Sequence, residues 1–219
     1  MESPRLNFPK QSLYLVTDSS LAPQGRLARI VEESIEGGVQ IVQYREKNFQ
    51  YSTHWLEAKK IHEICQKTKT LFLINDRVDL ALALDADGVH LGQSDMPVEI
   101  ARRILGKDKI IGWSIESLED LEHALEIHSR VQIDYLGVSP IYSTPTKTDT
   151  LGAWNLDGLS LVRARTNIPL VAIGGIKRLN ASEVINAGAD SLAVISEIIT
   201  SENPKSVCED FRNILSMKI

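Results

Sequence analysis

The stretch LFLINDRVDLALALDADGVHLG, residues 71–92, contains the pattern from which the fold can be inferred. Its first part, Leu71–Asp76, is a short apolar run that ends in polar residues, and Asp87–Gly92 is a second run of similar length. Between them, apolar residues recur three and four positions apart, which is typical of an amphipathic helix. A strand, a helix and a second strand in this order predict two parallel strands joined by a helical crossover.

The same alternation continues along the whole chain. Segments of helical spacing, such as Leu27, Ile30, Val31 and Ile35, separate the expected strands. Eight such units in 219 residues predict an α/β fold, a single (β/α)₈ TIM barrel that forms one domain over residues 1–219. An open, doubly wound sheet would give a similar alternation and is the alternative. The expected strands are Leu13–Asp18, Val39–Glu46, Leu71–Asp76, Asp87–Gly92, Ile110–Ile115, Asp134–Ile141, Pro169–Ile176 and Ser191–Ile198.

Two expected helices begin with recognisable signals. Asn203 followed by Pro204 predicts an N-cap and a first helical residue. Asn180, with Glu183 three residues later, resembles a capping box at the start of the seventh helix.

Composition narrows the class of protein. A formal net charge of -5 argues against a general nucleic-acid-binding protein, because contacts to phosphates need a basic surface. Cys65 and Cys208 lack the spacing of a disulfide framework or a metal site, so we expect reduced thiols. No signal-peptide pattern and no apolar run of membrane-spanning length is recognised, and we expect a cytoplasmic protein that does not act on membranes.

Polar and charged side chains stand at the end of the second expected strand. Alternation along the strand places Gln43, Arg45 and Lys47 on one face. Such side chains are costly in a buried barrel strand unless they have a partner or a ligand. The pattern favours an anion-binding site over the alternative, a fraying strand end in which Arg45 pairs with an acidic core residue.

Two aspartates stand near the ends of neighbouring expected strands: Asp76 ends the third, and Asp95 follows the fourth. In a barrel both loops lie on one rim, so the carboxylates can converge. Mg²⁺ usually takes one or two carboxylates together with substrate phosphate oxygens. The alternative is that each aspartate only caps the helix that follows it. Because two cations are expected opposite, we favour a magnesium site.

Two further regions have the composition of a phosphate site. Residues 143–148, STPTKT, combine hydroxyls with a lysine, and a polar turn is an equally good interpretation. Gly174 and Gly175 stand at the end of the seventh expected strand, and the eighth runs into Ile195 and Ser196. Barrel enzymes often bind phosphate with the loops after these two strands, although the glycines could simply form a tight turn.

Histidine receives no catalytic role. We expect His90, in the middle of the fourth strand, to be a hydrogen-bonded core residue, and His54, His62, His123 and His128 to lie on the solvent side of helices. The lack of a recognisable Ser-His-Asp or Cys-His arrangement argues against covalent hydrolysis.

Together these motifs resemble the thiamine phosphate synthase family. The resemblance extends from Leu13 to about Leu215 and is carried by several long motifs in the order of the strands. They are YLVTD (14–18), QYREK (43–47), INDR (74–77), ADGVHLGQ (86–93), TPTK (144–147) and IGGI (173–176).

The resemblance implies a transferase that joins 4-amino-5-hydroxymethyl-2-methylpyrimidine diphosphate to hydroxyethylthiazole phosphate and releases pyrophosphate. It implies Mg²⁺ held by Asp76 and Asp95, two small-molecule substrates and a dissociative substitution, and it suggests a homodimer. The implied catalytic residues are Arg45, Lys47, Ser114 and Lys147. The implied substrate-binding residues are Gln43, Tyr44, Arg45, Glu46, Lys47, Asn75, Ser114, Thr144, Thr146, Lys147, Gly175, Ile195 and Ser196.

Three other functions stay open. A thiazole tautomerase shares this fold but generally lacks the diphosphate-binding residues, which here include Asp76 and Asp95. A catalytically silent sensor of thiamine precursors would have no need of a buried Arg45, which costs stability. A sugar-phosphate lyase or epimerase would need a lysine or carboxylate base deep in the barrel, and none is recognised.

Overall fold

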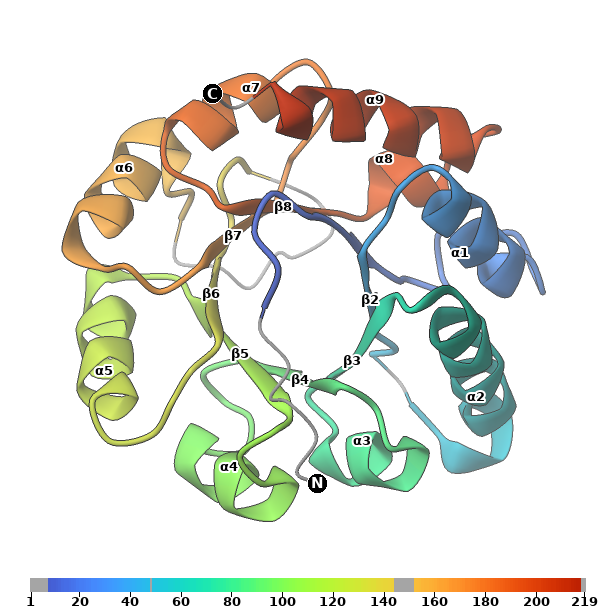
Figure 1. Cartoon of the computed structure of the whole chain (residues 1–219), viewed down its shortest axis with the longest axis horizontal. Helices are drawn as coiled ribbons and strands as arrows, with labels where there is room; N and C mark the ends of the chain where they lie inside the picture. Colours follow the sequence, from blue (N-terminus) through green and yellow to red (C-terminus); the bar gives the residue numbers. More distant parts are fainter. Residues whose placement is uncertain (1–7, 48, 144–151, 218–219) are drawn as a thin grey trace.

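The computed structural model describes residues 8–47, 49–143 and 152–217. Eight parallel strands form a closed barrel in the order of the chain, and helices surround it (Figure 1). The strands are β1 (Leu13–Val16), β2 (Ile41–Tyr44), β3 (Leu71–Asn75), β4 (Gly88–Leu91), β5 (Ile110–Ile115), β6 (Tyr135–Val138), β7 (Leu170–Ile173) and β8 (Ser191–Val194). The helices are α1 (Leu27–Glu36), α2 (Tyr51–Thr68), α3 (Val78–Leu84), α4 (Val98–Leu105), α5 (Leu118–His128), α6 (Asn155–Arg165), α7 (Ala181–Asn186), α8 (Ser196–Ile199) and α9 (Pro204–Ser216).

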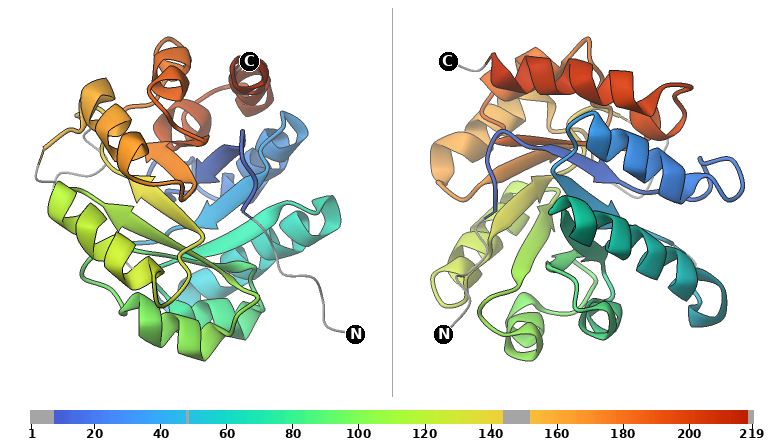
Figure 2. Two further views of the ribbon diagram at one scale, coloured as in Figure 1. Left: turned by 60° about the vertical axis from the view of Figure 1, so that its left-hand side comes forward. Right: turned by 45° about the vertical axis from the view of Figure 1, so that its right-hand side comes forward.

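Pairing between β1 and β8 closes the barrel, with Leu13 opposite Leu192 and Leu15 opposite Val194. The predicted fold class is therefore confirmed. The open doubly wound sheet is excluded, because its outer strands would not pair with each other. Figure 2 shows the helices as an outer layer, in which α1 packs between α2 and α9.

Alternation of side chains along the strands divides the core into two parts. Leu13 and Leu15 face outward and pack under the helices, whereas Tyr14 and Val16 face inward. Phe8 joins the inner core, and its ring stacks on Tyr135 with the centroids 4.2 Å apart.

The seventh strand is shorter than the predicted Pro169–Ile176. It ends at Ile173 because Gly174 and Gly175 adopt φ angles of 100° and 68°, which do not continue a strand.

The predicted eighth strand, Ser191–Ile198, is wrong beyond Val194. Residues 196–199 form the short helix α8, which buries Ile198 and Ile199. A short apolar run has no period that separates a strand from a buried helical turn.

Helix starts also differ in part from the sequence signals. Asn203 caps α9, because its side chain accepts the backbone N–H of Ser206 at 3.1 Å. The predicted capping arrangement at Asn180 is wrong. Its Oδ1 accepts the N–H of Lys177 and its Nδ2 donates to the carbonyl of Gly175, so the side chain holds the loop before α7 instead.

Two further predictions concern residues on the helices. Cys65 and Cys208 are free thiols, as predicted, and burial raises the pKa of each to about 12. The solvent-facing position predicted for His62 is wrong, because its ring is buried and stacks on Phe72. None of the helices in the described parts of the chain has the length and apolarity needed to cross a membrane.

Three aspartates at the base of the barrel repeat one arrangement. Each stands directly before an even-numbered strand, and its carboxylate accepts a backbone N–H from the preceding strand at 2.8–2.9 Å. Its own N–H donates to the carbonyl of the same partner residue. The pairs are Asp87 with Phe72, Asp134 with Ile111, and Asp190 with Leu170.

Asp134→Ala is expected to destabilise the barrel by about 3–5 kcal/mol, because it leaves Arg102, which is 2.7 Å away and 13% exposed, without its carboxylate. Urea unfolding followed by circular dichroism measures the change. Glu126→Ala is the control, since it breaks an exposed pair with Arg130 and should change stability by less than about 1 kcal/mol. If both variants lost the same free energy of unfolding, Asp134 would contribute no more to stability than an exposed ion pair does.

Candidate functional site

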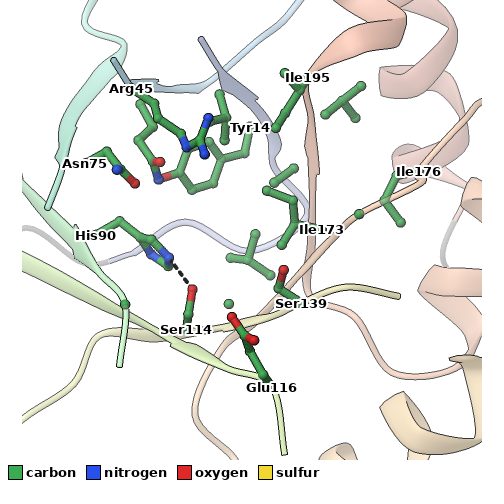
Figure 3. Close-up of a pocket in the computed structure, with 18 of the residues that line it drawn as sticks. Tyr14, Arg45, Asn75, His90, Ser114, Glu116, Ser139, Ile173, Ile176 and Ile195 are labelled. Atoms are coloured by element: carbon green, nitrogen blue, oxygen red, sulfur yellow. Dashed lines mark hydrogen bonds between the residues drawn. The ribbon is translucent and has the colours of Figure 1, made fainter. Parts of the chain in front are cut away.

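A cavity of about 1000 Å³ opens at the carboxyl ends of the strands (Figure 3). One side of its wall, here called the polar half, carries Arg45, Asn75 and Ser114. The opposite side, the apolar half, carries Ile173 and Ile195. The cavity therefore offers two chemically different surfaces that face each other.

The end of β2 supplies an amide and two cations to the polar half. Gln43, Arg45 and Lys47 all line the cavity, as the alternation of the strand predicts. Gln43 is buried and donates from Nε2 to the hydroxyl of Tyr14 at 2.7 Å. Arg45 lies 3.7 Å from Asp18, so it has an acidic neighbour and also faces the cavity.

Tyr44 and Glu46, which alternate with these residues, are not brought to the cavity wall. The Tyr44 hydroxyl donates to Glu57 of α2 at 3.1 Å. Glu46 accepts a hydrogen bond from the hydroxyl of Ser19. The even-numbered positions of this segment thus hold the strand to its surroundings.

Asp76 and Asp95 lie together on the rim, and neither caps a helix. The N-cap positions of α3 and α4 are Arg77 and Pro97. Asp95 instead accepts the N–H of Gly92 at 2.6 Å. The alternative of two helix caps is therefore wrong.

The two carboxylates are close enough to influence each other. The pKa of Asp76 is raised to about 7, mainly by partial burial and secondly by the neighbouring Asp95. Arg45 and a hydrogen bond from Asn75 lower this pKa and so partly offset the rise. Asn75 Nδ2 donates to Asp76 Oδ2 at 2.5 Å. Two adjacent acids on an open rim fit a hard divalent cation, which would remove their repulsion and complete its shell with phosphate and water.

Ser114 lies deeper in the polar half and is only 8% exposed. Its Oγ is 2.8 Å from Nε2 of His90, and Nδ1 of His90 is 2.9 Å from the hydroxyl of Tyr135. His90 is thus the hydrogen-bonded core residue that was predicted, although it also lines the cavity.

Sequence reasoning did not assign several residues that line the cavity. Tyr14 and Tyr135 reach it from the inner core, and Glu116, Ser139 and Lys177 reach it from loops. The inward parity of Tyr14 on β1 and of Tyr135 on β6 was the available signal for the two tyrosines.

On the apolar half, Gly174 and Gly175 allow two loops to approach closely. A Cβ on Gly174 would lie 2.6 Å from Pro140 Cβ, and one on Gly175 would lie 2.7 Å from Tyr142 Cβ. Ser196, at the start of α8, also lines the cavity. This is the position at which barrel enzymes often bind phosphate.

Three of the predicted substrate-binding residues, Thr144, Thr146 and Lys147, lie outside the described residues. The last described residue before them, Ser143, lines the cavity.

A closed barrel with a cavity at the carboxyl ends of its strands defines the class of (β/α)₈-barrel enzymes, whose active sites are found at this face. Within that class the family is also defined. Residues 13–198 match the family model described as thiamine monophosphate synthase, and the chain belongs to this family.

Relatives support the assignment over nearly the whole chain. The thiamine-phosphate synthase of Albidiferax ferrireducens is 50% identical over 88% of this chain and 86% of its own. That of Leptospira biflexa is 48% identical over 93% and 97%. A solved structure, thiamine phosphate pyrophosphorylase from Pyrococcus furiosus, has a TM-score of 0.83 at 37% identity, over 94% of this chain and 96% of its own. The predicted resemblance and the prediction of a transferase are confirmed.

Proposed function

We propose that the protein joins 4-amino-5-hydroxymethyl-2-methylpyrimidine diphosphate to hydroxyethylthiazole phosphate, with Mg²⁺, to give thiamine phosphate and pyrophosphate. The observation that carries the proposal is the division of the cavity into a polar and an apolar half. Two different substrates must meet in one site, and the two halves match a diphosphate on one side and a neutral ring with one phosphate on the other.

The polar half suits the pyrimidine diphosphate. Arg45 and Lys47 provide positive charge for the diphosphate, and Asn75 and Ser114 provide hydrogen-bonding groups beside them. Gln43 lies below Arg45 on the same strand face, where its amide can form hydrogen bonds with the edge of the pyrimidine ring.

Asp76 and Asp95 would hold the magnesium ion. When bound, the ion would neutralise charge on the diphosphate and make it a better leaving group. Without a cation the two carboxylates would repel the diphosphate, and a magnesium ion held by them would remove this repulsion.

We propose a dissociative substitution. The bond between the pyrimidine methylene carbon and the diphosphate oxygen breaks first, with its electron pair leaving on the diphosphate, and the thiazole nitrogen then donates its lone pair to the methylene cation. Arg45 and Lys47 stabilise the negative charge that grows on the leaving group. The attacking nitrogen carries no proton, so the reaction requires no general base.

The apolar half suits the thiazole phosphate. Ile173 and Ile195 offer a surface for the ring, and Gly175 and Ser196 offer backbone N–H groups and a hydroxyl for its phosphate. Holding both rings in contact supplies the orientation that the second step needs.

The proposal includes a cytoplasmic enzyme that acts on small molecules, without a nucleic-acid or membrane partner, and that forms a homodimer. Light scattering of the purified protein measures the oligomeric state.

Purified protein, Mg²⁺ and both substrates are expected to give thiamine phosphate, measured by thiochrome fluorescence, and EDTA should abolish the product. Asp95→Asn should lower kcat/KM by about two orders of magnitude without unfolding the protein, because Asp95 is a proposed metal ligand. The control Asp108→Asn alters an exposed residue of the loop between α4 and β5 and should have no effect. A folded wild type that binds thiazole phosphate but forms no product would favour a tautomerase or a sensor.

Gly175→Ala is expected to raise the KM for thiazole phosphate about tenfold and to leave that for the pyrimidine diphosphate within about twofold, because the new Cβ would push against Tyr142 and displace the phosphate loop. Gly106→Ala is a matched control, since Gly106 also has a positive φ, of 81°, but open space around it. A rise in both KM values to the same extent in Gly175→Ala would contradict separate subsites.

A further inference from the structure

A chain of hydrogen bonds crosses the floor of the cavity. Each contact is between 2.7 and 2.9 Å long. It consists, in order, of the side chains of Gln43, Tyr14, Tyr135, His90 and Ser114, here called the relay. Its two ends line the polar half of the cavity, and its three central members bring together strands β1, β4 and β6.

The barrel makes room for the relay at two glycines that cannot carry a side chain. A Cβ on Gly112 would lie 2.0 Å from Cζ of Tyr135. A Cβ on Gly137 would lie 2.9 Å from Cε1 of His90 and 3.7 Å from Oγ of Ser114. The side chains of Tyr135 and His90 therefore occupy space that is available only because residues 112 and 137 are glycines.

Proton counting gives the relay a direction. Gln43 donates from Nε2 to the hydroxyl of Tyr14. The other partner of this hydroxyl is that of Tyr135, so Tyr14 donates its own proton to Tyr135. Tyr135 in turn donates to Nδ1 of His90, and Nε2–H of His90 donates to Ser114. Gln43 also forms a side-chain hydrogen bond with Tyr135, which uses the second proton of its amide nitrogen. In this arrangement every donor inside the relay has an acceptor, and the hydroxyl proton of Ser114 is left for a ligand.

The opposite direction is unfavourable. If His90 carried its proton on Nδ1 and donated to Tyr135, Tyr135 would donate to Tyr14, which already accepts from Gln43. The hydroxyl proton of Tyr14 would then have no acceptor among the described residues, and Tyr14 is 1% exposed. Burial raises the pKa of both tyrosines, so each keeps its single proton.

We propose that the relay is directional and makes Ser114 a hydrogen-bond donor, and Gln43 Oε1 an acceptor, toward the ligand. Tyr14, Tyr135 and His90 are then positioning residues. The ligand that fits has an acceptor nitrogen at one edge and an N–H donor at another, as an aminopyrimidine has; this part rests on the proposed function. An oxo group in place of the amino group would present the reverse pattern.

The tautomer of His90 tests the direction without any substrate. In the full-length protein labelled with ¹⁵N-histidine, long-range ¹H–¹⁵N spectra should show His90 as the Nε2–H tautomer, its signals identified by their loss in His90→Gln. Gln43→Glu can only accept, so it should reverse the relay and convert His90 to the Nδ1–H form. The double variant Gln43→Glu/Tyr135→Phe, in which the relay is interrupted, should keep Nε2–H.

A wild-type protein with His90 in the Nδ1–H form or doubly protonated at neutral pH would overturn the direction, whether or not the variants fold. So would a Gln43→Glu variant of native circular dichroism whose His90 stays Nε2–H.

Binding tests the consequence for the ligand. By calorimetry, the wild type should bind the aminopyrimidine diphosphate at least about tenfold more tightly than its oxo analogue, which corresponds to one well-placed buried hydrogen bond. Tyr135→Phe should reduce this preference to less than about threefold. In the Ser114→Ala background, Tyr135→Phe should not reduce this preference any further. If Tyr135 had a merely structural role, the two substitutions would reduce the preference additively.

Undiminished preference in Tyr135→Phe would overturn the effect on the ligand. If the wild type bound neither pyrimidine while His90 showed the expected tautomer and its reversal, the proposed function would fail and the direction of the relay would stand.

Discussion

Closure of eight parallel strands on themselves is the constraint on which the rest of this structure depends. Because β8 pairs with β1 as each strand pairs with the next, the carboxyl ends of all eight strands meet on one rim. Residues as distant in the chain as Arg45 and Ile195 therefore line one cavity. Closure also requires the interior to be filled, and the inner core that does this below the cavity includes the two tyrosines of the relay.

The sequence was sufficient for the order and number of the strands, because alternating apolar runs and helical spacing depend on local side-chain pattern. It was insufficient where tertiary contacts decide the local structure. Ile198 and Ile199 continue an apolar run but form a turn of helix that packs into the core. Asn180 has the spacing of a cap but hydrogen-bonds to the loop before its helix, and His62 is buried by its stacking on Phe72.

The candidate site was predictable where charge stands at the end of a buried strand. Gln43, Arg45, Asp76 and Asp95 attract attention because such residues are costly unless they serve a ligand. The alternation of the strand also separates Arg45 from Tyr44 and Glu46, which the family motif alone groups together. The relay was not predictable in this way. Its tyrosines are common core residues, and only the register across the barrel brings their hydroxyls within hydrogen-bonding distance.

The aspartates before β4, β6 and β8 give the base of the barrel a repeating unit of two strands, about a quarter turn around the axis. The rim lacks this repeat: cations follow β2, aspartates follow β3 and β4, and glycines follow β7. The base thus repeats at three of the four even-numbered strands, with Gln40 in place of the aspartate before β2, whereas the rim has no repeat. Binding two different molecules in distinct positions requires an asymmetric surface. Closing a sheet into a barrel requires only that similar contacts between strands be repeated.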